Sequence, residues 1–308
     1  MKVFITRPIP EKGTQMLKAK GYEVVINEAA SDRPATGEEI LEGIRGADAL
    51  LSILTDKISA EIIEAGLPTL KIIANYAVGF DNIDIPFAKK NNILVTNAPS
   101  NEVNEAVAEH TFALMLALAR RIVDTDRLLL HHKYHAWGPS LWLGTGLAGK
   151  VLGIVGPGRI GTAVGKHAEG FGMKVVFCGE NDSIDDFLPK CDFISLHVPL
   201  LDSTYHLINE ARLKKMKPTA YLINTSRGSV IDEQALADAL KKGVIRGAGL
   251  DVFEHEPKVN PDLLKLENVV LTPHTASATV EARTKMAEVA ATNIIEALEG
   301  RTPPNLIQ

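Results

Sequence analysis

Lys150-Val-Leu-Gly-Ile-Val-Gly-Pro-Gly-Arg-Ile-Gly161 joins an apolar strand directly to three glycines with the spacing G-x-G-x-x-G. In this pattern Gly156 permits a tight turn, Gly158 lets a pyrophosphate approach the main chain, and Gly161 lets the next helix pack against the sheet. The free N–H groups at the start of that helix, together with the positive end of its dipole, bind phosphates. The stretch therefore predicts a dinucleotide-binding site.

The residues on either side of this motif decide between a nucleotide site and a glycine-rich turn that binds nothing. Val151–Val155 has the composition of a buried strand. The apolar and small residues after the glycines have helical spacing: Ile160, Ala163, Val164, His167 and Ala168. A strand, the glycines and a helix in this order favour the nucleotide site.

Composition narrows the class of protein. A chain of 308 residues with 45% hydrophobic residues suits two domains, each with its own core. The net charge of −5 and the lack of a basic block argue against a nucleic-acid partner. No apolar run reaches about 18 residues and Met1–Ile5 leads into a turn, so we expect no membrane partner and a cytoplasmic location. Cys178 and Cys191 border apolar strands and are expected to be small core residues.

Short apolar strands alternate with helical segments in the first hundred residues. The helical segments include Gly37–Ile44 and Ser59–Ala65. The predicted strands are Val3–Ile5, Glu23–Ile26, Ala49–Ile53, Lys71–Ala74 and Leu94–Thr96. Alternation of this kind predicts an α/β domain with a parallel sheet covered on both faces.

A single long helix is predicted at Glu102–Leu130. Its segment Thr111–Ala119 is apolar almost all round, so it must be buried between domains or between subunits. The following segment, His132–Leu147, has no clear period and predicts an extended arm. Because this apolar surface exceeds what one small domain can cover, we expect the helix and the arm, with Trp137 and Trp142, to form a homodimer interface.

A second αβ series follows the glycine motif. The predicted strands lie at Lys174–Cys178, Phe193–Leu196, Ala220–Asn224, Gly247–Asp251 and Val269–Thr272. A last helix is expected from Thr279 to about Glu299, where Gly300 ends it. The whole chain is thus expected to be α/β, with two doubly wound parallel-sheet domains.

Polar side chains follow three strands of this second series. Ligands of open α/β sheets bind beyond the carboxyl ends of the strands, so these segments should converge near the cofactor. They are Leu222-Ile-Asn-Thr-Ser-Arg-Gly228, Gly249-Leu-Asp-Val-Phe-Glu-His-Glu-Pro257 and Leu271-Thr-Pro-His274. We expect Arg227, Glu256 and His274 in one cleft.

With these segments the sequence resembles the D-isomer-specific 2-hydroxyacid dehydrogenases, and within them the glyoxylate/hydroxypyruvate reductase group. The shared motifs run from Tyr76-Ala-Val-Gly-Phe-Asp-Asn-Ile-Asp84 through Ala108-Glu-His110 and Gly156–Gly161 to Ser226-Arg-Gly228, Asp251-Val-Phe-Glu254, Glu256-Pro257 and Pro273-His274. The resemblance implies a Rossmann cofactor domain, residues 100–274, inserted in a flavodoxin-like substrate domain, residues 1–99 and 275–308. It also implies hydride transfer between NAD(P)H and a small 2-oxo acid or D-2-hydroxy acid.

The resemblance gives each catalytic candidate a role that its chemistry can support. Arg227 holds the substrate carboxylate and carbonyl oxygen through its planar fork. His274 donates a proton to the carbonyl oxygen as hydride arrives, because an imidazole exchanges protons near neutral pH. Glu256 orients the imidazole and favours its charged form. Taken singly, each residue has an ordinary structural explanation; three strand ends in the family's order favour catalysis.

The resemblance also implies binding residues. In Ala77-Val-Gly79 the main-chain N–H groups of Val78 and Gly79 meet the substrate carboxylate, and Leu54 forms an apolar wall; without the resemblance an ordinary strand-to-helix turn would be favoured. The cofactor is NAD, with NADP as the alternative. The expected cofactor contacts are Gly156, Gly158, Arg159, Ile160, Gly161, Glu180, His197, Val198, Pro199, Thr204, Asn224, Thr225, Ser226 and Asp251.

One departure from the family concerns the segment after Cys178. Cys178-Gly-Glu-Asn-Asp182 passes almost directly into an acidic helix, Ser183–Leu188, so about one βα unit is absent. Gly179 stands where relatives carry the acid that binds the ribose, and Glu180 follows it. Since no Arg or Lys lies between Gly179 and Pro189, we expect a preference for NAD, with Glu180 as its cause.

Other interpretations remain open at this stage. A D-3-phosphoglycerate dehydrogenase and a non-catalytic NAD(H)-sensing protein are alternatives on the same scaffold, although the complete catalytic set argues against the second. His131, His132 and His135 suggest a metal site only weakly, because no Cys or carboxylate joins them, and no metal is expected. Asp81 or Asp84 is expected to cap the helix that enters Ile85-Pro86.

Overall fold

The computed structural model describes residues 1–307 and divides the chain into two compact units. Unit 1 comprises Met1–Val103 and Ala278–Gln308, and unit 2 comprises Asn104–Ser277. The divisions fall a few residues beyond the expected limits of 99 and 274. Helix α5 (Asn101–Ala119) therefore begins in unit 1 and ends in unit 2.

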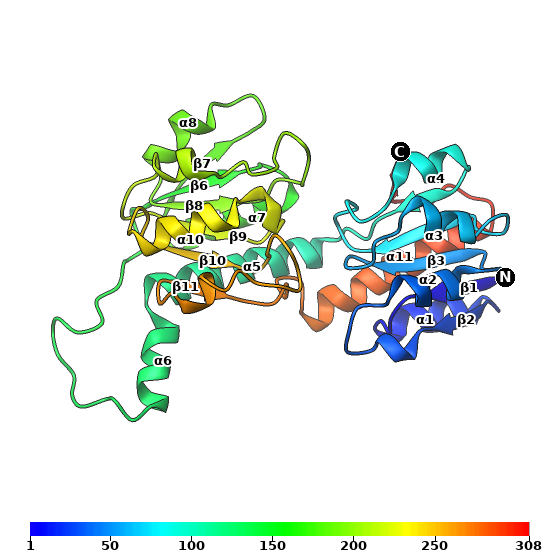
Figure 1. The fold of residues 1–308 in the computed structure, drawn as a ribbon, viewed down its shortest axis with the longest axis horizontal. Coiled ribbons are helices and arrows are strands. Elements are labelled where there is room, and N and C mark those ends of the chain that lie inside the picture. Colours follow the sequence, from blue (N-terminus) through cyan, green and yellow to red (C-terminus); the bar gives the residue numbers. More distant parts are fainter. Residues whose placement is uncertain (308) are drawn as a thin grey trace. The chain divides into compact units, whose positions relative to one another are not determined.

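Unit 1 is built on a six-stranded sheet with the order β12-β5-β4-β3-β1-β2; Figure 1 labels its strands β3, β1 and β2. Its strands are β1 (Lys2–Ile5), β2 (Glu23–Ile26), β3 (Ala49–Ile53), β4 (Ile72–Tyr76), β5 (Leu94–Thr96) and β12 (Leu306–Ile307). The pairs are parallel except β12 with β5. The order of the five parallel strands is the flavodoxin-like order 2-1-3-4-5.

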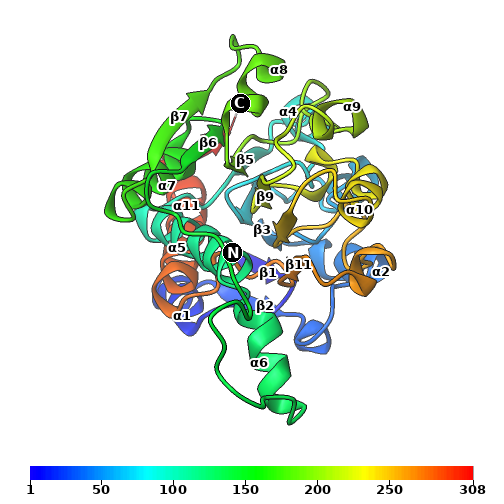
Figure 2. The same ribbon diagram turned by 90° about the vertical axis from the view of Figure 1, so that its left-hand side faces the viewer.

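Helices cover both faces of this sheet. Phe4, Leu50 and Ile73 lie side by side on β1, β3 and β4 and point to the same face of the sheet. They pack against α2 (Gly37–Ile44), α3 (Ala60–Ala65) and α4 (Ile85–Lys90). Elsewhere in the unit α1 (Glu11–Ala19) packs on α11 (Val280–Leu298), which contacts β4 (Figures 1 and 2). An alanine at Gly13 would bring its Cβ within 2.8 Å of the Ala287 carbonyl oxygen, so this contact is close.

Local sequence explains where two of these helices start. Thr36 and Glu39 form a capping box at α2, in which each side chain accepts a hydrogen bond from the other residue's backbone N–H. Asp84 accepts a hydrogen bond from the N–H of Phe87 at the start of α4, where a proline is tolerated. Of the two carboxylates expected to cap this helix, Asp84 is the one that does.

Unit 2 contains the second six-stranded sheet, with the order β11-β10-β9-β8-β6-β7 and every pair parallel. Its strands are β6 (Val151–Val155), β7 (Lys174–Cys178), β8 (Phe193–Leu196), β9 (Tyr221–Asn224), β10 (Gly247–Leu250) and β11 (Val269–Leu271). One face packs on α5 and α7 (Arg159–Gly170). The other packs on α8 (Ile184–Phe187), α9 (Glu210–Leu213) and α10 (Glu233–Lys241). Cys178 and Cys191 lie buried and free in this second core, as expected.

The strand order of unit 2 is a Rossmann order from which the outermost strand is missing. Chain direction along the sheet reverses between β6 and β8, which makes their carboxyl ends the switch point where ligands bind. Strand β7 lies at the edge of the sheet and is followed directly by α8. The expected loss of one βα unit after Cys178 therefore leaves β7 uncovered on its outer side.

The prediction of one long helix at Glu102–Leu130 is wrong. The helix breaks at Arg121, which has a left-handed backbone (φ 55°), and α6 (Ile122–Leu130) leaves in a different direction (Figure 1). The end of α5 is fixed by the arm, because the N–H of Thr145 donates to the Ala119 carbonyl at 2.7 Å. The Arg121 side chain pairs with Asp124 and lies over the ring of Trp142. Burial is confirmed for α5 but not for α6, which has no buried residue.

In the part of the chain that the structure describes, no helix is long and apolar enough to span a membrane.

Candidate active site

The glycine-rich turn has the shape that the sequence predicts. Gly156 adopts a left-handed φ of 94°, and a Cβ there would lie 2.8 Å from the main chain of His197. A Cβ at Gly161 would lie 2.2 Å from the Gly156 carbonyl oxygen, so α7 can start this close to β6 only with glycine. The N–H of Gly156 donates to the Cys178 carbonyl at 3.0 Å, which ties the turn to the end of β7.

The same turn leaves room for a dinucleotide. A Cβ at Gly158 would meet nothing within 4 Å, so the main chain there is open to an incoming group. Gly158 is also the N-cap of α7 and offers no side-chain cap, which leaves the first N–H groups of the helix available to phosphate oxygens. Arg159 and Ile160 begin this helix. The residues present thus fit a pyrophosphate.

His197, Val198 and Pro199 follow β8, next to the glycine turn. The N–H of His197 donates to the Val155 carbonyl, and its Nε2 lies 2.8 Å from the Ser195 hydroxyl. Burial lowers the pKa of His197 to about 4, so this imidazole is neutral at physiological pH. Thr204 closes the next loop, because its hydroxyl donates to the Pro199 carbonyl at 2.6 Å and accepts from the N–H of Leu201 at 2.8 Å.

Asn224, Thr225, Ser226 and Arg227 follow β9. The buried Asn224 amide donates to the Arg227 carbonyl and accepts from the backbone and hydroxyl of Ser226, so it shapes the turn that presents Arg227. The guanidinium of Arg227 donates to the Ser226 carbonyl at 2.9 Å. A Cβ at Gly228 would lie 1.9 Å from the Phe253 carbonyl carbon. The Arg227 loop and the loop that carries Glu256 are therefore in direct main-chain contact.

Asp251 follows β10 and is fully buried. Its carboxylate accepts hydrogen bonds from the hydroxyl of Thr272 (2.7 Å), the N–H of Thr275 (2.8 Å) and the N–H of Ala276 (2.8 Å), with His110 Nε2 at 3.4 Å. Burial alone raises the pKa of Asp251, but these donors outweigh it and lower the pKa, so the carboxylate stays ionised. In this structure Asp251 fixes the loop on both sides of His274.

His274 follows β11 and pairs with Glu256. The Nδ1 atom of His274 lies 2.8 Å from Glu256 Oε2, while the other carboxylate oxygen accepts from the N–H of Phe253 at 3.0 Å. His274 has a left-handed φ of 53°, held by hydrogen bonds from its N–H to the Asp251 and Thr272 carbonyls. Its Nε2 has no partner among the described residues, and the side chain is 23% exposed. This is the arrangement of an oriented acid–base group with one nitrogen free.

The structure thus brings together the three strand ends in unit 2, since β9, β10 and β11 are adjacent. Leu54, Val78 and Gly79 all lie in unit 1, partly exposed, in the loops after β3 and β4. Glu180 is exposed in the turn after β7. The described residues contain no group of three His, Cys, Asp or Glu side chains placed to hold a metal ion.

Sequence reasoning missed Asp182. Its carboxylate accepts a hydrogen bond from the N–H of Gly179 at 2.7 Å, at the carboxyl end of β7. A Cβ at Gly179 would lie 3.5 Å from that carboxylate and 3.8 Å from Pro157, so Gly179 sits between Asp182 and the glycine turn. Asp side chains often accept hydrogen bonds from nearby backbone N–H groups at turns, so the position of Asp182 close after Gly179 was a signal available in the sequence.

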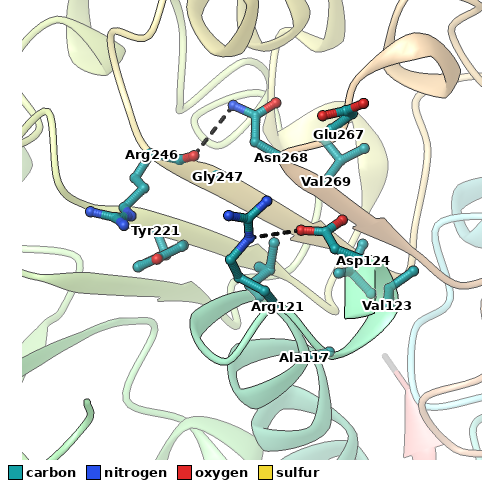
Figure 3. A pocket seen from close by; sticks show the side chains of 12 residues that line it. Ala117, Arg121, Val123, Asp124, Tyr221, Arg246, Gly247, Glu267, Asn268 and Val269 are labelled. Atoms are coloured by element: carbon teal, nitrogen blue, oxygen red, sulfur yellow. Dashed lines mark hydrogen bonds and ion pairs between the residues drawn. The ribbon is translucent and has the colours of Figure 1, made fainter. Parts of the chain in front are cut away.

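The pocket in Figure 3, of about 250 Å³, lies elsewhere in unit 2. It is lined by Gly247 and Val269 at the amino ends of β10 and β11, and by Arg121 and Asp124 from the junction of α5 and α6. This is the end of the sheet opposite to Arg227 and His274. The pocket therefore takes no part in the candidate active site.

Comparison with known proteins identifies the class that this fold and site define. Residues 112–276 match the family model described as "D-isomer specific 2-hydroxyacid dehydrogenase, NAD binding domain", and the chain belongs to that family. The resemblance drawn from the motifs is thereby confirmed.

Individual relatives match along the full length. A glyoxylate reductase of Thermofilum pendens is 49% identical over 322 residues, which cover 99% of this chain and 94% of the relative. A glyoxylate reductase of Thermococcus litoralis is 50% identical over 323 residues, with 99% and 96% covered. The crystal structure of the TT0316 protein of Thermus thermophilus superposes with a TM-score of 0.94 at 40% identity, over the whole of both chains. The first two alignments are longer than this chain, so both relatives carry segments that it lacks.

Proposed function

We propose that this protein reduces glyoxylate or hydroxypyruvate to the corresponding 2-hydroxy acid with NAD(P)H. The observation that carries the proposal is the His274–Glu256 pair, in which the imidazole of His274 is oriented and its Nε2 is free. His274 follows β11, Glu256 follows the adjacent strand β10, and Arg227 follows β9, the next strand of the sheet. The names of the two glyoxylate reductases, at 49% and 50% identity, support the choice of substrate.

The reaction divides between the cofactor and the residues of the chain. A nicotinamide cofactor, when bound, would supply the hydride that the carbonyl carbon of the 2-oxo acid accepts. Arg227 binds the carbonyl oxygen and the carboxylate, which stabilises the negative charge that develops on the oxygen. His274 donates a proton from Nε2 to that oxygen, and Glu256 at Nδ1 stabilises the imidazolium before transfer and keeps the ring oriented. In the reverse direction His274 takes the proton back.

We assign the two binding tasks to different units. Unit 2 binds the dinucleotide through the glycine turn, α7 and the ends of β8 and β9 with the loops that follow them, which hold all the expected cofactor contacts except Glu180 after β7 and Asp251 after β10. Unit 1 binds the substrate carboxylate through Val78 and Gly79, with Leu54 on an adjacent loop. The cytoplasmic location is part of the same proposal.

A substrate panel tests the function. Glyoxylate, hydroxypyruvate, pyruvate and phosphohydroxypyruvate, each with NADH and NADPH, are compared by the loss of absorbance of the reduced cofactor. We expect the highest kcat/KM with glyoxylate or hydroxypyruvate. A preference for phosphohydroxypyruvate would replace the proposal by the phosphoglycerate reaction, and no turnover of any 2-oxo acid would favour a protein that senses NAD(H).

For the cofactor we predict a preference for NADH over NADPH. Asp182 and Glu180 both place a carboxylate after β7, where the adenosine ribose binds in this fold, and Asp182 is the one held against the strand end. A carboxylate there accepts hydrogen bonds from the ribose hydroxyls and repels a 2′-phosphate. We expect Asp182→Ala to lower the NADH/NADPH ratio of kcat/KM by about tenfold, a like-charge effect of ordinary size.

The companion variants separate the two carboxylates. Glu180→Ala tests the assignment made from the sequence, and Asp186→Ala, a carboxylate on α8, is the matched control and should leave the ratio unchanged. Equal or better use of NADPH by the wild type would refute the preference. An unchanged ratio in both Asp182→Ala and Glu180→Ala would show that neither carboxylate causes it.

We also propose that the protein is a homodimer joined through α6 and the arm. Large apolar side chains are exposed there, among them Leu130 (68%), Trp137 (81%) and Leu143 (64%), more than a monomer usually leaves in water. Sedimentation at micromolar concentration should give a dimer, and Trp137→Glu should shift it toward the monomer. Leu264→Glu, at a leucine that is 63% exposed elsewhere in unit 2, serves as the control. A monomeric wild type would contradict the proposal.

A further inference from the structure

Three consecutive carbonyl groups after β4 are all held by the body of unit 1. The Ala77 carbonyl accepts from the N–H of Ala98 at 2.7 Å. The Val78 carbonyl accepts from the side-chain amide of Asn97 at 2.7 Å, and the Gly79 carbonyl accepts from the side-chain amide of Asn75 at 2.9 Å. These hydrogen bonds fix the directions of all three carbonyl groups.

Fixing these carbonyls also fixes the N–H groups. In a trans peptide the N–H points opposite to the C=O of the same plane, so the N–H groups of Val78, Gly79 and Phe80 point away from the three donors. None of these three N–H groups has an acceptor among the described residues. Val78 and Gly79 are partly exposed and Phe80 is 40% exposed, so an incoming anion can reach them.

The geometry points to a preformed anion cradle in which Asn75 and Asn97 are the positioning residues and the N–H of Phe80 is an additional donor to the substrate carboxylate. This inference rests on the proposed function, which places a carboxylate at Val78 and Gly79. Asn75 and Asn97 do not touch the substrate in it. They act through the peptide planes that they hold.

Asn75 is itself held so that its amide can face only one way. It is fully buried in β4, where its Oδ1 accepts from the Ser52 hydroxyl at 3.0 Å. Its Nδ2 donates to Asn82 Oδ1 at 2.9 Å as well as to Gly79, and Asn82 returns a hydrogen bond to Asn75 Oδ1 at 3.3 Å. With every donor and acceptor satisfied, a flipped amide would lose several bonds at once.

The same network reaches the other substrate loop. The two hydrogens of Asn82 Nδ2 are shared among Asn75 Oδ1 and the carbonyls of Ile53 (3.2 Å) and Asp56 (3.0 Å), which flank Leu54. Asn97 is anchored separately, since its carbonyl accepts from the buried Asn293 of α11 at 3.0 Å. Because the loop is already ordered, anion binding costs little conformational entropy. The preorganised N–H donors therefore bind the anion more tightly than donors on a mobile loop would.

The test is Asn97→Ala, because Asn97 is only partly buried and its removal should leave the fold intact. We expect the KM for glyoxylate and the dissociation constant for oxalate to rise by about tenfold, which is the worth of one hydrogen bond. The KM for NADH and kcat at saturating glyoxylate should stay within about twofold of wild type. Asn75→Asp, nearly isosteric but unable to donate to Gly79, should act in the same direction.

Asn91→Ala is the matched control. Its side-chain amide also donates to a backbone carbonyl in unit 1, that of Phe87 at 2.9 Å, but at the end of α4. It should leave the glyoxylate and oxalate constants unchanged. Equal losses in Asn91→Ala and Asn97→Ala, an unchanged glyoxylate KM in Asn97→Ala, or a fall in kcat with a rise in the NADH KM would overturn the inference.

Calorimetric titration with oxalate in the presence of NAD⁺ separates this inference from the proposed function. Suppose that the wild type binds oxalate, that Asn97→Ala binds it about tenfold more weakly, and that neither turns over a 2-oxo acid. The cradle would then be retained and the proposed function would be wrong. If the wild type turns over glyoxylate but binds oxalate no more tightly than Asn75→Asp and Asn97→Ala do, the cradle alone would be ruled out.

Discussion

Replacing His274 by alanine is expected to lower kcat by about two to four orders of magnitude, the usual contribution of a positioned general acid. The reason is that the free Nε2 of His274 is the group proposed to protonate the carbonyl oxygen, and the pairing of Nδ1 with Glu256 leaves only Nε2 for that task. Steady-state reduction of glyoxylate measures the loss. Fluorescence titration with NADH should meanwhile give an affinity near that of wild type, because His274 contributes to the chemistry and not to the glycine turn.

His255→Ala is a suitable control for this experiment. His255 is exposed, lies one residue before Glu256, and has no part in the proposed reaction. Its replacement should leave kcat within about twofold of wild type. Near-normal turnover by the His274→Ala protein would end the assignment of His274 as the acid.

The second large effect is expected for Arg227→Lys, which should raise the KM for glyoxylate by about ten- to a hundredfold. A lysine keeps the charge but loses the planar fork, and a charge-assisted hydrogen bond of this kind is worth about 1.5–3 kcal/mol. The Asn224 amide and the close approach of Gly228 to Phe253 fix the main chain around Arg227, so a lysine cannot move to recover the contact. The KM for NADH should change little.

Arg45→Lys provides the comparison, since Arg45 is exposed on unit 1 and far in the chain from Arg227 and His274. Both constants should be those of wild type in that variant. If Arg227→Lys also leaves the glyoxylate KM and kcat unchanged, Arg227 has a structural role only.

The sequence predicts the parallel sheets well, because each strand is a short apolar run and the glycine motif sets the start of the second series. Adjacent strands with carboxyl ends at one edge then follow from the α/β rule, so Arg227 and His274 could be placed near each other before any coordinates. The break at Arg121 could not be predicted. Helical spacing continues through it, and the cause is a contact with Thr145, which lies far along the chain.

The residues that position the site through hydrogen bonds could not be predicted from the sequence either. Asn75 and Asn97 look like ordinary polar residues at strand ends, and their purpose depends on which carbonyl each amide meets in three dimensions. Asp251 remains a predicted cofactor contact, but its hydrogen bonds from Thr272, Thr275 and Ala276, which position the His274 loop, could not be foreseen from the sequence. Spacing along a chain identifies groups that can react, but the hydrogen bonds that orient them join segments whose distance in the sequence carries no pattern.

The uncovered edge at β7 has a consequence for the protein in solution. A parallel edge strand offers a row of open backbone groups to any other extended chain, and here Val176 (37% exposed) and Phe177 (45% exposed) add apolar contact to it. Lys174 at its first position is the only charge on the strand that discourages such pairing. Strand-to-strand aggregation on heating or concentration should therefore begin at this edge, and a lysine at Val176 would be the first change to make for a more soluble preparation.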